Sequence, residues 1–339
     1  MTARRPKARQ ARMEDVARRA GVSAITVSRV LRSPDVVSER TRERVAKAIA
    51  AMRYVPNRVA GMLASQRSNV IAAVIPSINH SALESMVQGM TDAASESGLH
   101  LMLVTSGDSL AGEADAIEAI LAHRPCGLCL HNTVHSARAR SLLRNAGIPV
   151  VETGDLPQRP LDVAVGFSNF DAARAMTLHL ARRGYRRIAY IGRTRDSSVR
   201  ARERLDGYRA GLRECAQPAA EGITREVSGW TAAAGAALVD ILGEDPAVDA
   251  VFCGAGVLAV GALMECQRQG WPVPQRLAIA GFDDSELAAN TVPPLTSLRI
   301  PRYDIGRKAA ELLLGRANGA AAGPRRFDLG FDIIERASA

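Results

Sequence analysis

The sequence predicts an N-terminal three-helix headpiece with a helix-turn-helix, followed by a larger α/β domain of two lobes with parallel sheets. Three observations lead to this fold. The 339 residues exceed the length of an ordinary single domain. The excess positive charge is confined to the first sixty residues. From residue 69 onward, apolar segments of strand length alternate with amphipathic segments of helical length, which favours parallel sheets with right-handed crossovers.

The distribution of charge points to a polyanionic partner. Residues 1–60 contain 15 Lys and Arg against 5 Asp and Glu, a net charge of +10, whereas residues 61–339 contain 29 against 30, a net charge of −1. Basic side chains gathered in one module neutralise phosphates and release their counterions. A solvated basic tail is the alternative for such a block, and it suits residues 1–12 only.

The composition excludes several other classes. No apolar run reaches about 18 residues, and the N-terminus lacks the apolar stretch of a secretory signal, so neither a membrane span nor export is expected. The five cysteines are scattered, which argues against a disulfide framework. We therefore expect a cytoplasmic protein, associated with the nucleoid when it is bound to DNA.

Residues 13–32 have the pattern of two short helices joined by a tight turn. Val16 and Ala20 lie on one apolar stripe, Gly21 permits the turn, and Ser23 can cap the second helix. Two helices joined in this way form a helix-turn-helix, whose second helix enters the major groove of DNA.

A third helix is expected to complete the headpiece. Ser38 should cap it, and it should run from Thr41 to about Arg53 with four apolar residues facing inward: Val45, Ala48, Ile49 and Met52. A generic three-helix bundle is the alternative, and the local positive charge favours DNA binding.

Three pieces of this region, DVARRAGVSAITVSRVL, VSERTRERV and YVPNRVAGMLAS, resemble the headpiece and hinge of the LacI/GalR repressor family in order and spacing. The resemblance extends along nearly the whole chain and is strongest to the gluconate-operon repressors. It implies a headpiece over 13–56, a hinge helix and linker over 57–68, and an effector-binding and dimerisation domain over 69–339. That domain would have the periplasmic-binding-protein-like fold, with its lobes exchanging strands near Ser168 and Ile300.

The start of the second helix is expected to face the groove. Ala24 and Ile25 can make only apolar contacts there, for example with a thymine methyl group, while Arg29 suits a bidentate contact with guanine. Thr26 and Ser28 suit phosphate contacts. A phosphate contact is also the alternative for Arg29.

The resemblance adds Tyr54, Asn57, Arg58 and Leu63 to the DNA-binding residues. In the family the hinge helix folds on DNA beside its twofold mate, and a Leu at the position of Leu63 wedges into the minor groove. A helix this short is marginal alone. Packing of Leu63 on the core is the alternative. The expected partner is a pseudo-palindromic operator bound by a homodimer.

The larger domain contains nine strand candidates and eight helix candidates. The strands are Val70–Ile75, Leu99–Thr105, Gly127–Leu130, Pro149–Glu152, Val163–Phe167, Ile188–Ile191, Ala250–Cys253, Leu277–Gly281 and Leu295–Ile300. The helices are 82–96, 113–123, 137–146, 170–183, 201–214, 231–242, 256–269 and 302–316.

Ligand-binding side chains are expected where parallel strands end, facing a cleft between the lobes. The candidates are Ser77, His131, Asp155, Arg204, Trp230, Ala255 and Asp283. By resemblance, Arg204 matches an effector-binding Arg, Trp230 an aromatic that packs on the effector, and Asp283 a hydroxyl acceptor. These groups suit a polyhydroxylated ligand, especially one with a carboxylate, such as a sugar acid.

Each of these candidates has a structural alternative. Arg204 could pair with Glu203 or Asp206 on a solvated helix face, and Trp230 could belong to the core. A buried structural role is equally open for His131.

One departure from the family affects the effector. Where the family usually carries Asn-Asp after the strand ending at Cys253, this chain has Ala255 and Gly256. A hydrogen-bonding group and a charge are absent, which weakens the case for an ordinary sugar and leaves gluconate or a relative. An effector-independent DNA-binding protein stays open as well.

Two further motifs, one rich in glycine and one with two cysteines, have alternative interpretations. Gly254-x-Gly256-x-x-Ala259, with Asp283 ending the next strand, would fit a dinucleotide-binding sensor or oxidoreductase. Cys126 and Cys129 form a C-x-x-C motif, but a zinc site needs four ligands and the pair follows a predicted strand, so core thiols are expected. Nothing in the sequence supports catalysis, a cofactor or a metal site.

Overall fold

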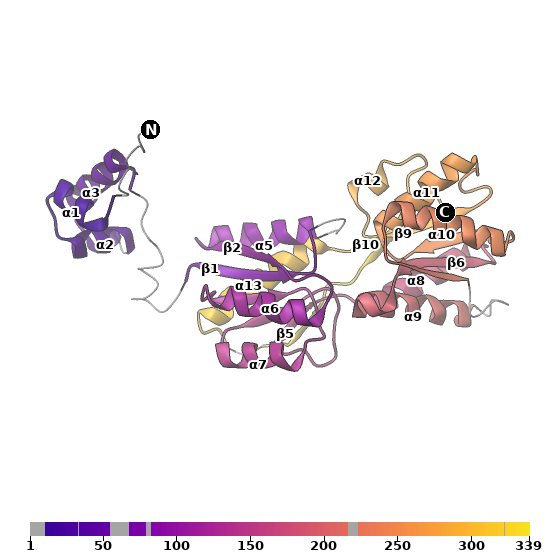
Figure 1. The fold of residues 1–339 in the computed structure, drawn as a ribbon, viewed down its shortest axis with the longest axis horizontal. Coiled ribbons are helices and arrows are strands. Elements are labelled where there is room, and N and C mark those ends of the chain that lie inside the picture. The colour runs from indigo at the N-terminus through magenta and orange to yellow at the C-terminus, as the bar shows by residue number, and fades with distance from the viewer. Residues whose placement is uncertain (1–10, 33, 55–67, 79–82, 216–222, 322) are drawn as a thin grey trace, which may run out of the picture. The chain divides into compact units, whose positions relative to one another are not determined.

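The computed structural model describes most of the chain in two compact units, Met1–Gln66 and Arg67–Ala339 (Figure 1). The described residues are 11–32, 34–54, 68–78, 83–215, 223–321 and 323–339. The expected hinge residues Asn57, Arg58 and Leu63 lie outside them. Among the described helices, none combines the length and the apolar character that crossing a membrane requires.

The first unit contains the three expected helices. They are α1 (Met13–Ala20), α2 (Ala24–Arg32) and α3 (Glu39–Met52), with the short 3₁₀ helix η1 (Pro34–Val36) between the last two. Their buried apolar residues form one core: Val16, Ala17, Ala20, Val27, Val45, Ala48 and Tyr54. Ile49 and Met52 pack against this core at its edge, as the helical periodicity predicts.

The turn between α1 and α2 depends on Gly21. Its φ is +62°, and a Cβ at this position would lie 2.7 Å from the guanidinium of Arg44. That guanidinium donates to the carbonyls of Ala20 (2.6 Å) and Gly21 (3.0 Å), so it closes the C-terminal end of α1. The hydroxyl of Ser23 accepts the backbone N–H of Thr26 (3.1 Å), which confirms the expected cap of α2.

Helix α3 begins two residues earlier than predicted. Ser38 occupies the capping position, but its hydroxyl lies 3.0 Å from that of Thr41 and accepts no backbone N–H. The helix therefore starts at Glu39, whose carboxylate in the first turn suits the positive end of the helix dipole.

The second unit contains two six-stranded sheets, one in each lobe. The first sheet has the order β11-β5-β4-β3-β1-β2 and all its pairs are parallel. Its strands are β1 (Val70–Ile75), β2 (His100–Thr105), β3 (Gly127–Leu130), β4 (Val150–Glu152), β5 (Val163–Gly166) and β11 (Arg326–Asp328).

The second sheet has the order β12-β10-β9-β8-β6-β7 and is parallel except where β12 runs antiparallel to β10. Its strands are β6 (Ile188–Arg193), β7 (Thr224–Val227), β8 (Ala250–Cys253), β9 (Ala278–Phe282), β10 (Thr296–Arg299) and β12 (Asp332–Ile334). The predicted α/β class with parallel sheets is therefore confirmed, with one antiparallel edge.

Helices cover both faces of each sheet. In the first lobe they are α5 (Glu84–Glu96), α6 (Leu110–Leu121), α7 (Ala137–Ala146) and α13 (Arg302–Ala317). In the second lobe they are α8 (Asn169–Arg182), α9 (Val199–Glu214), α10 (Thr231–Glu244), α11 (Gly256–Gln269) and α12 (Glu286–Ala289), with the 3₁₀ helix η2 (Arg195–Ser197).

Strand β1 shows why a strand covered by helices on both faces has a continuous apolar sequence. Ile71 and Ile75 pack in the core cluster on one face of the sheet, while Ala72 and Val74 pack in the cluster on the other. Successive side chains of a strand point to opposite faces, so a strand covered on both sides must be apolar throughout.

The chain passes between the lobes three times. It leaves the first lobe after β5, returns between β10 and α13, and crosses again between β11 and β12. The sequence did not predict the third crossing. Strands β11 and β12 have three residues each and charged positions, and β7 is half-buried, so none of the three has a strong apolar signal.

Candidate functional site

Helix α2 presents two of the expected DNA contacts to solvent. Ile25 is 72% exposed, and Arg29 is exposed as well. Ala24, Thr26 and Ser28 are half-buried. An isoleucine with this much exposure is not part of the headpiece core, so it is available for an apolar contact.

Tyr54 is different from the other expected DNA contacts. It is 8% exposed and belongs to the headpiece core. A side chain packed in this way stabilises the three helices. Tyr54 therefore has a packing role, and its expected contact with DNA stays a prediction.

The second unit holds a cavity of about 450 Å³ at the carboxyl ends of strands from both lobes. Six of the seven expected effector residues line it: Ser77, His131, Arg204, Trp230, Ala255 and Asp283. The sequence reasoning missed ten other lining residues: Pro76, Leu83, Asp108, Tyr190, Arg193, Ser198, Arg200, Ala201, Gly254 and Arg302. Such a volume is typical of small-molecule sites.

Arg204 reaches the cavity from α9 and is buried, so it does not lie on a solvated helix face. Its Nε donates to Asn169 Oδ1 (2.8 Å), its Nη1 donates to the carbonyl of Gly254 (2.6 Å), and its guanidinium stacks 3.7 Å from the ring centroid of Phe282. Burial lowers the pKa of Arg204, while the charge of Asp283 opposes that shift. The guanidinium remains charged and is held in a single orientation.

Asp155 acts on this arginine indirectly. It is not among the described residues that line the cavity. Its Oδ1 instead accepts the side-chain amide of Asn169 (3.0 Å), and that amide also donates to the carbonyl of Gly154 (2.8 Å). Asn169 is therefore fixed so that its oxygen faces Arg204.

Arg193 and Trp230 form a second wall. The guanidinium lies 4.4 Å from the centroid of the Trp230 ring, and its Nη1 donates to the carbonyl of Gly229 (3.1 Å). Its Nη2 lies 3.9 Å from a carboxylate oxygen of Asp108 in the first lobe. Trp230 is half-buried, so it flanks the cavity and is not part of the core.

His131 lies on the first-lobe side of the cavity. Its Nδ1 is 3.1 Å from the hydroxyl of Thr153. Burial lowers the pKa of His131 well below its usual range, and the charges of Arg200, Arg302 and Arg204 lower it further. The imidazole is therefore neutral at pH 7 and adds no positive charge to the cavity.

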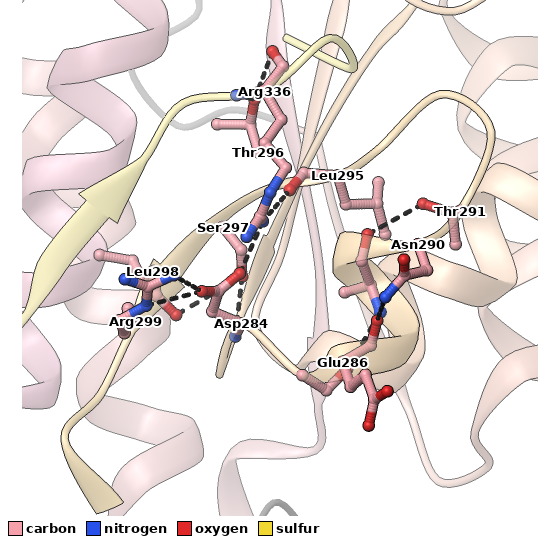
Figure 2. Close-up of polar contacts among 12 residues, drawn as sticks. Asp284, Glu286, Asn290, Thr291, Leu295, Thr296, Ser297, Leu298, Arg299 and Arg336 are labelled. Atoms are coloured by element: carbon pink, nitrogen blue, oxygen red, sulfur yellow. Dashed lines mark hydrogen bonds and ion pairs between the residues drawn. The ribbon is translucent and has the colours of Figure 1, made fainter.

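Asp283 is held in a strained loop after β9. Asp283 and Asp284 have φ of +77° and +44°, in the left-handed region that few non-glycine residues adopt. Figure 2 shows how Asp284 is clamped: its carboxylate accepts from Arg299 Nε (2.8 Å) and Arg336 Nη1 (2.6 Å), while its N–H donates to the hydroxyl of Ser297 (3.1 Å). The clamp fixes the backbone from which Asp283 projects.

The carboxylate of Asp283 has two partners already. It forms an ion pair with Arg302 and lies close enough to the backbone N–H of Gly256, at the start of α11, for that group to help lower its pKa. Burial alone would raise the pKa of Asp283, but Arg302 and Arg204 outweigh it and lower the pKa. Asp283 thus brings an ionised carboxylate near the N-terminus of a helix whose own capping residue, Ala255, has no polar side chain.

The close packing of this loop on α11 accounts for the glycine at position 256. A Cβ at Gly256 would lie 2.5 Å from the carbonyl oxygen of Phe282, so the loop bearing Asp283 can approach α11 only if residue 256 is glycine.

The same geometry does not favour the dinucleotide alternative. A Cβ at Gly254 would lie 2.2 Å from the hydroxyl of Tyr190, so the space over this glycine is filled by an aromatic ring. The N-terminus of α11, which would hold a pyrophosphate, faces the carboxylate of Asp283. A second anion there would be repelled.

The cysteine motif contributes to packing. Cys129 is fully buried in β3, and burial raises its pKa to about 12, while Cys126 packs against the same core cluster. Within the described ranges, no group of three or more His, Cys, Asp and Glu side chains is arranged to hold a metal ion.

Comparisons with known proteins agree with this architecture. Residues 12–57 match the model of the bacterial regulatory proteins of the lacI family, and residues 177–339 match a periplasmic binding protein-like domain. The HTH-type transcriptional regulator GntR of Escherichia coli K12 is 35% identical over 322 residues, covering 95% of this chain and 96% of that protein.

Two solved structures are similar over nearly their whole length. A LacI-family transcriptional regulator from Silicibacter pomeroyi is 32% identical with a TM-score of 0.88, covering 97% of this chain and 99% of that one. The lac repressor dimer, bound to operator and the anti-inducer ONPF, is 27% identical with a TM-score of 0.86 and the same coverage. The named relatives are transcriptional regulators and not enzymes, and the chain belongs to the LacI family of bacterial transcriptional regulators.

Proposed function

We propose that this protein is a transcriptional repressor that binds a pseudo-palindromic operator as a homodimer and leaves it when a sugar acid, such as gluconate, enters the cavity. The cytoplasm is the proposed location, with association to the nucleoid in the DNA-bound state. The headpiece would supply sequence recognition, and the two-lobed unit would supply the response to the effector.

The exposed face of α2 supports the proposal that the headpiece binds an operator. A single headpiece offers few base contacts, here chiefly Ile25 and Arg29, and twofold symmetry doubles them. The lac repressor, which is similar along nearly its whole length, is a dimer bound to operator in its solved structure. The net charge of +10 over residues 1–60 supplies the electrostatic attraction for DNA.

The positive charge of the cavity supports the proposal that the effector is an anion. Its described lining contains four guanidiniums, of Arg193, Arg200, Arg204 and Arg302, but only two carboxylates. Both carboxylates already have arginine partners, Asp283 with Arg302 and Asp108 with Arg193. This leaves Arg200 and Arg204 without a carboxylate from the described lining. The remaining positive charge is buried, so an anion is the ligand that compensates it, while His131, Ser77 and the Trp230 face suit hydroxylated carbons.

The effector test compares gluconate with glucose, which has six carbons and hydroxyls but no charge. We expect gluconate, and not glucose, to raise the melting temperature and to release a fluorescent operator selected from random duplexes, at fixed salt. Arg204→Ala should abolish the response and keep operator binding. Arg202→Ala, an exposed arginine of the same helix, is the matched control.

The DNA test uses Arg29→Ala. Loss of a bidentate guanine contact should cost about 1–3 kcal/mol and relax the preference at one base pair of each half-site. Arg18→Ala, a mostly exposed arginine of α1, controls for general charge. An equal loss of affinity for all duplexes would instead assign Arg29 to a phosphate. A protein that prefers no duplex over random competitor would refute the proposed function.

A further inference from the structure

A buried cluster of ionisable side chains lies in the first lobe, outside the cavity lining. Glu113 comes from α6, Glu152 from β4 and His135 from the loop before α7, and each is no more than 5% exposed. The imidazole bridges the two carboxylates: Nδ1 is 2.9 Å from Glu113 Oε2, and Nε2 is 3.2 Å from Glu152 Oε1. Three such groups are costly to bury unless they are paired.

The cluster keeps one net negative charge. Burial by itself lowers the pKa of His135, but the hydrogen bonds with Glu113 and Glu152 outweigh it and raise the pKa to about 9. At neutral pH an imidazolium therefore faces two carboxylates. The other charged group directed at His135 is Arg140 of α7, whose Nε donates to the backbone carbonyl of His135 (3.2 Å).

Asn132 connects this cluster to the second lobe. Its Nδ2 donates to Glu113 Oε1 (3.0 Å), and its Oδ1 accepts from Arg200 Nη1 (3.1 Å). A carboxylate only accepts hydrogen bonds and a guanidinium only donates them. A flipped amide would therefore oppose both neighbours, so Glu113 dictates which atom of Asn132 faces Arg200.

Arg200 is the arginine that the side-chain oxygen of Asn132 holds in place. It projects from α9 of the second lobe, lines the cavity, and donates also to the carbonyl of His131 (2.8 Å). Burial, together with the like charges of Arg204 and Arg302, lowers its pKa to about 10. The guanidinium is thus held among other cations by acceptors of the opposite lobe and by the negative cluster behind them.

We propose that Glu113, His135 and Glu152 are positioning residues that act across the lobes: through Asn132 they hold Arg200 in the cavity, ready to receive an anion. The consequence for release from DNA rests on the function proposed above, whereas the contact between the lobes does not. The experiment therefore has one arm without effector and one arm with it.

The first arm measures hydrogen exchange of the full-length protein with no effector present. His135→Gln and Asn132→Ala should each accelerate exchange in the first turns of α9, which belong to the other lobe, and leave α10 unchanged. His123→Gln, an exposed histidine of the same lobe, is the matched control. A cluster that only stabilised its own lobe would alter exchange around β3, β4 and α6 without reaching α9, and that result would overturn the proposal.

The second arm titrates the operator complex with gluconate. Asn132→Ala and His135→Gln should each raise the concentration for half-release about fivefold or more, with operator affinity in the absence of gluconate within about twofold of the parent. If both act through one contact, the double variant should be no worse than Asn132→Ala alone. Additive losses would overturn the proposal.

The hydrogen-exchange arm tests the contact between the lobes, and the operator-release arm tests the proposed effector. A parent protein that ignores gluconate contradicts the proposed effector, and the exchange experiment still decides the contact between the lobes. If His135→Gln does not fold, Asn132→Ala leaves the cluster intact and tests the same link.

Discussion

Removal of the Asp284 carboxylate is the sharpest test of how the cavity is built. This side chain is 3% exposed and holds two arginines of unequal burial: Arg336 is 17% exposed and Arg299 is 54% exposed (Figure 2). Breaking a buried ion pair by removing one partner costs about 3–5 kcal/mol, whereas a pair at the surface contributes about 0–1 kcal/mol. The contact with Arg336 should therefore dominate the loss.

The backbone adds to this cost. Asp284 has a φ of +44°, where alanine is less stable than aspartate or asparagine by about 1 kcal/mol. We expect Asp284→Ala to lower the free energy of unfolding by about 4–6 kcal/mol in total, and Asp284→Asn, which keeps the shape and tolerates this backbone, to lower it less. Arg299→Ala should cost under about 1 kcal/mol.

Urea unfolding followed by tryptophan fluorescence measures these losses directly. Both tryptophans, Trp230 and Trp271, belong to the second unit, so the signal reports on that unit alone. A double-mutant cycle with Arg336→Ala isolates the pair. The reasoning is wrong if Asp284→Ala costs less than about 1 kcal/mol, or if Arg299→Ala costs as much as Asp284→Ala.

Two further predictions concern pH and packing. The pKa of His135 is raised from 6.5 to about 9 on folding, so its contribution to stability is complete below about pH 6.5 and is lost as the pH rises through 9. Relative to His135→Gln, the free energy of unfolding should fall by about 3 kcal/mol over that range, and parallel pH profiles would contradict this. Gly256→Ala places a Cβ 2.5 Å from the carbonyl of Phe282 and should cost about 1–3 kcal/mol by chemical denaturation. Gly243→Ala, in α10 with open space around its Cβ position, should be neutral or stabilising, and equal losses for both would exclude a steric cause.

The sequence by itself determined the headpiece helices, most strands of both sheets and the cavity residues that follow strands, such as Ser77 and His131, while Arg204 and Trp230 came from the family resemblance. These follow from local physics: a glycine at a tight turn, a capping serine, apolar runs covered on both sides, and polar residues where parallel strands end. The family resemblance supplied the order of the units and the residues to compare.

Only the tertiary structure decided how charge is arranged in the cavity. Arg200 lies one helical turn before Arg204 on α9, whereas Arg302 of α13 joins them only because helices of different lobes meet there. Glu152 lies at the end of a strand, where a ligand-binding residue is expected. Its carboxylate is instead paired with the imidazole of His135 in the buried interior. Pairing between charges depends on distance and burial, which residues far apart in the chain acquire only when the lobes fold together.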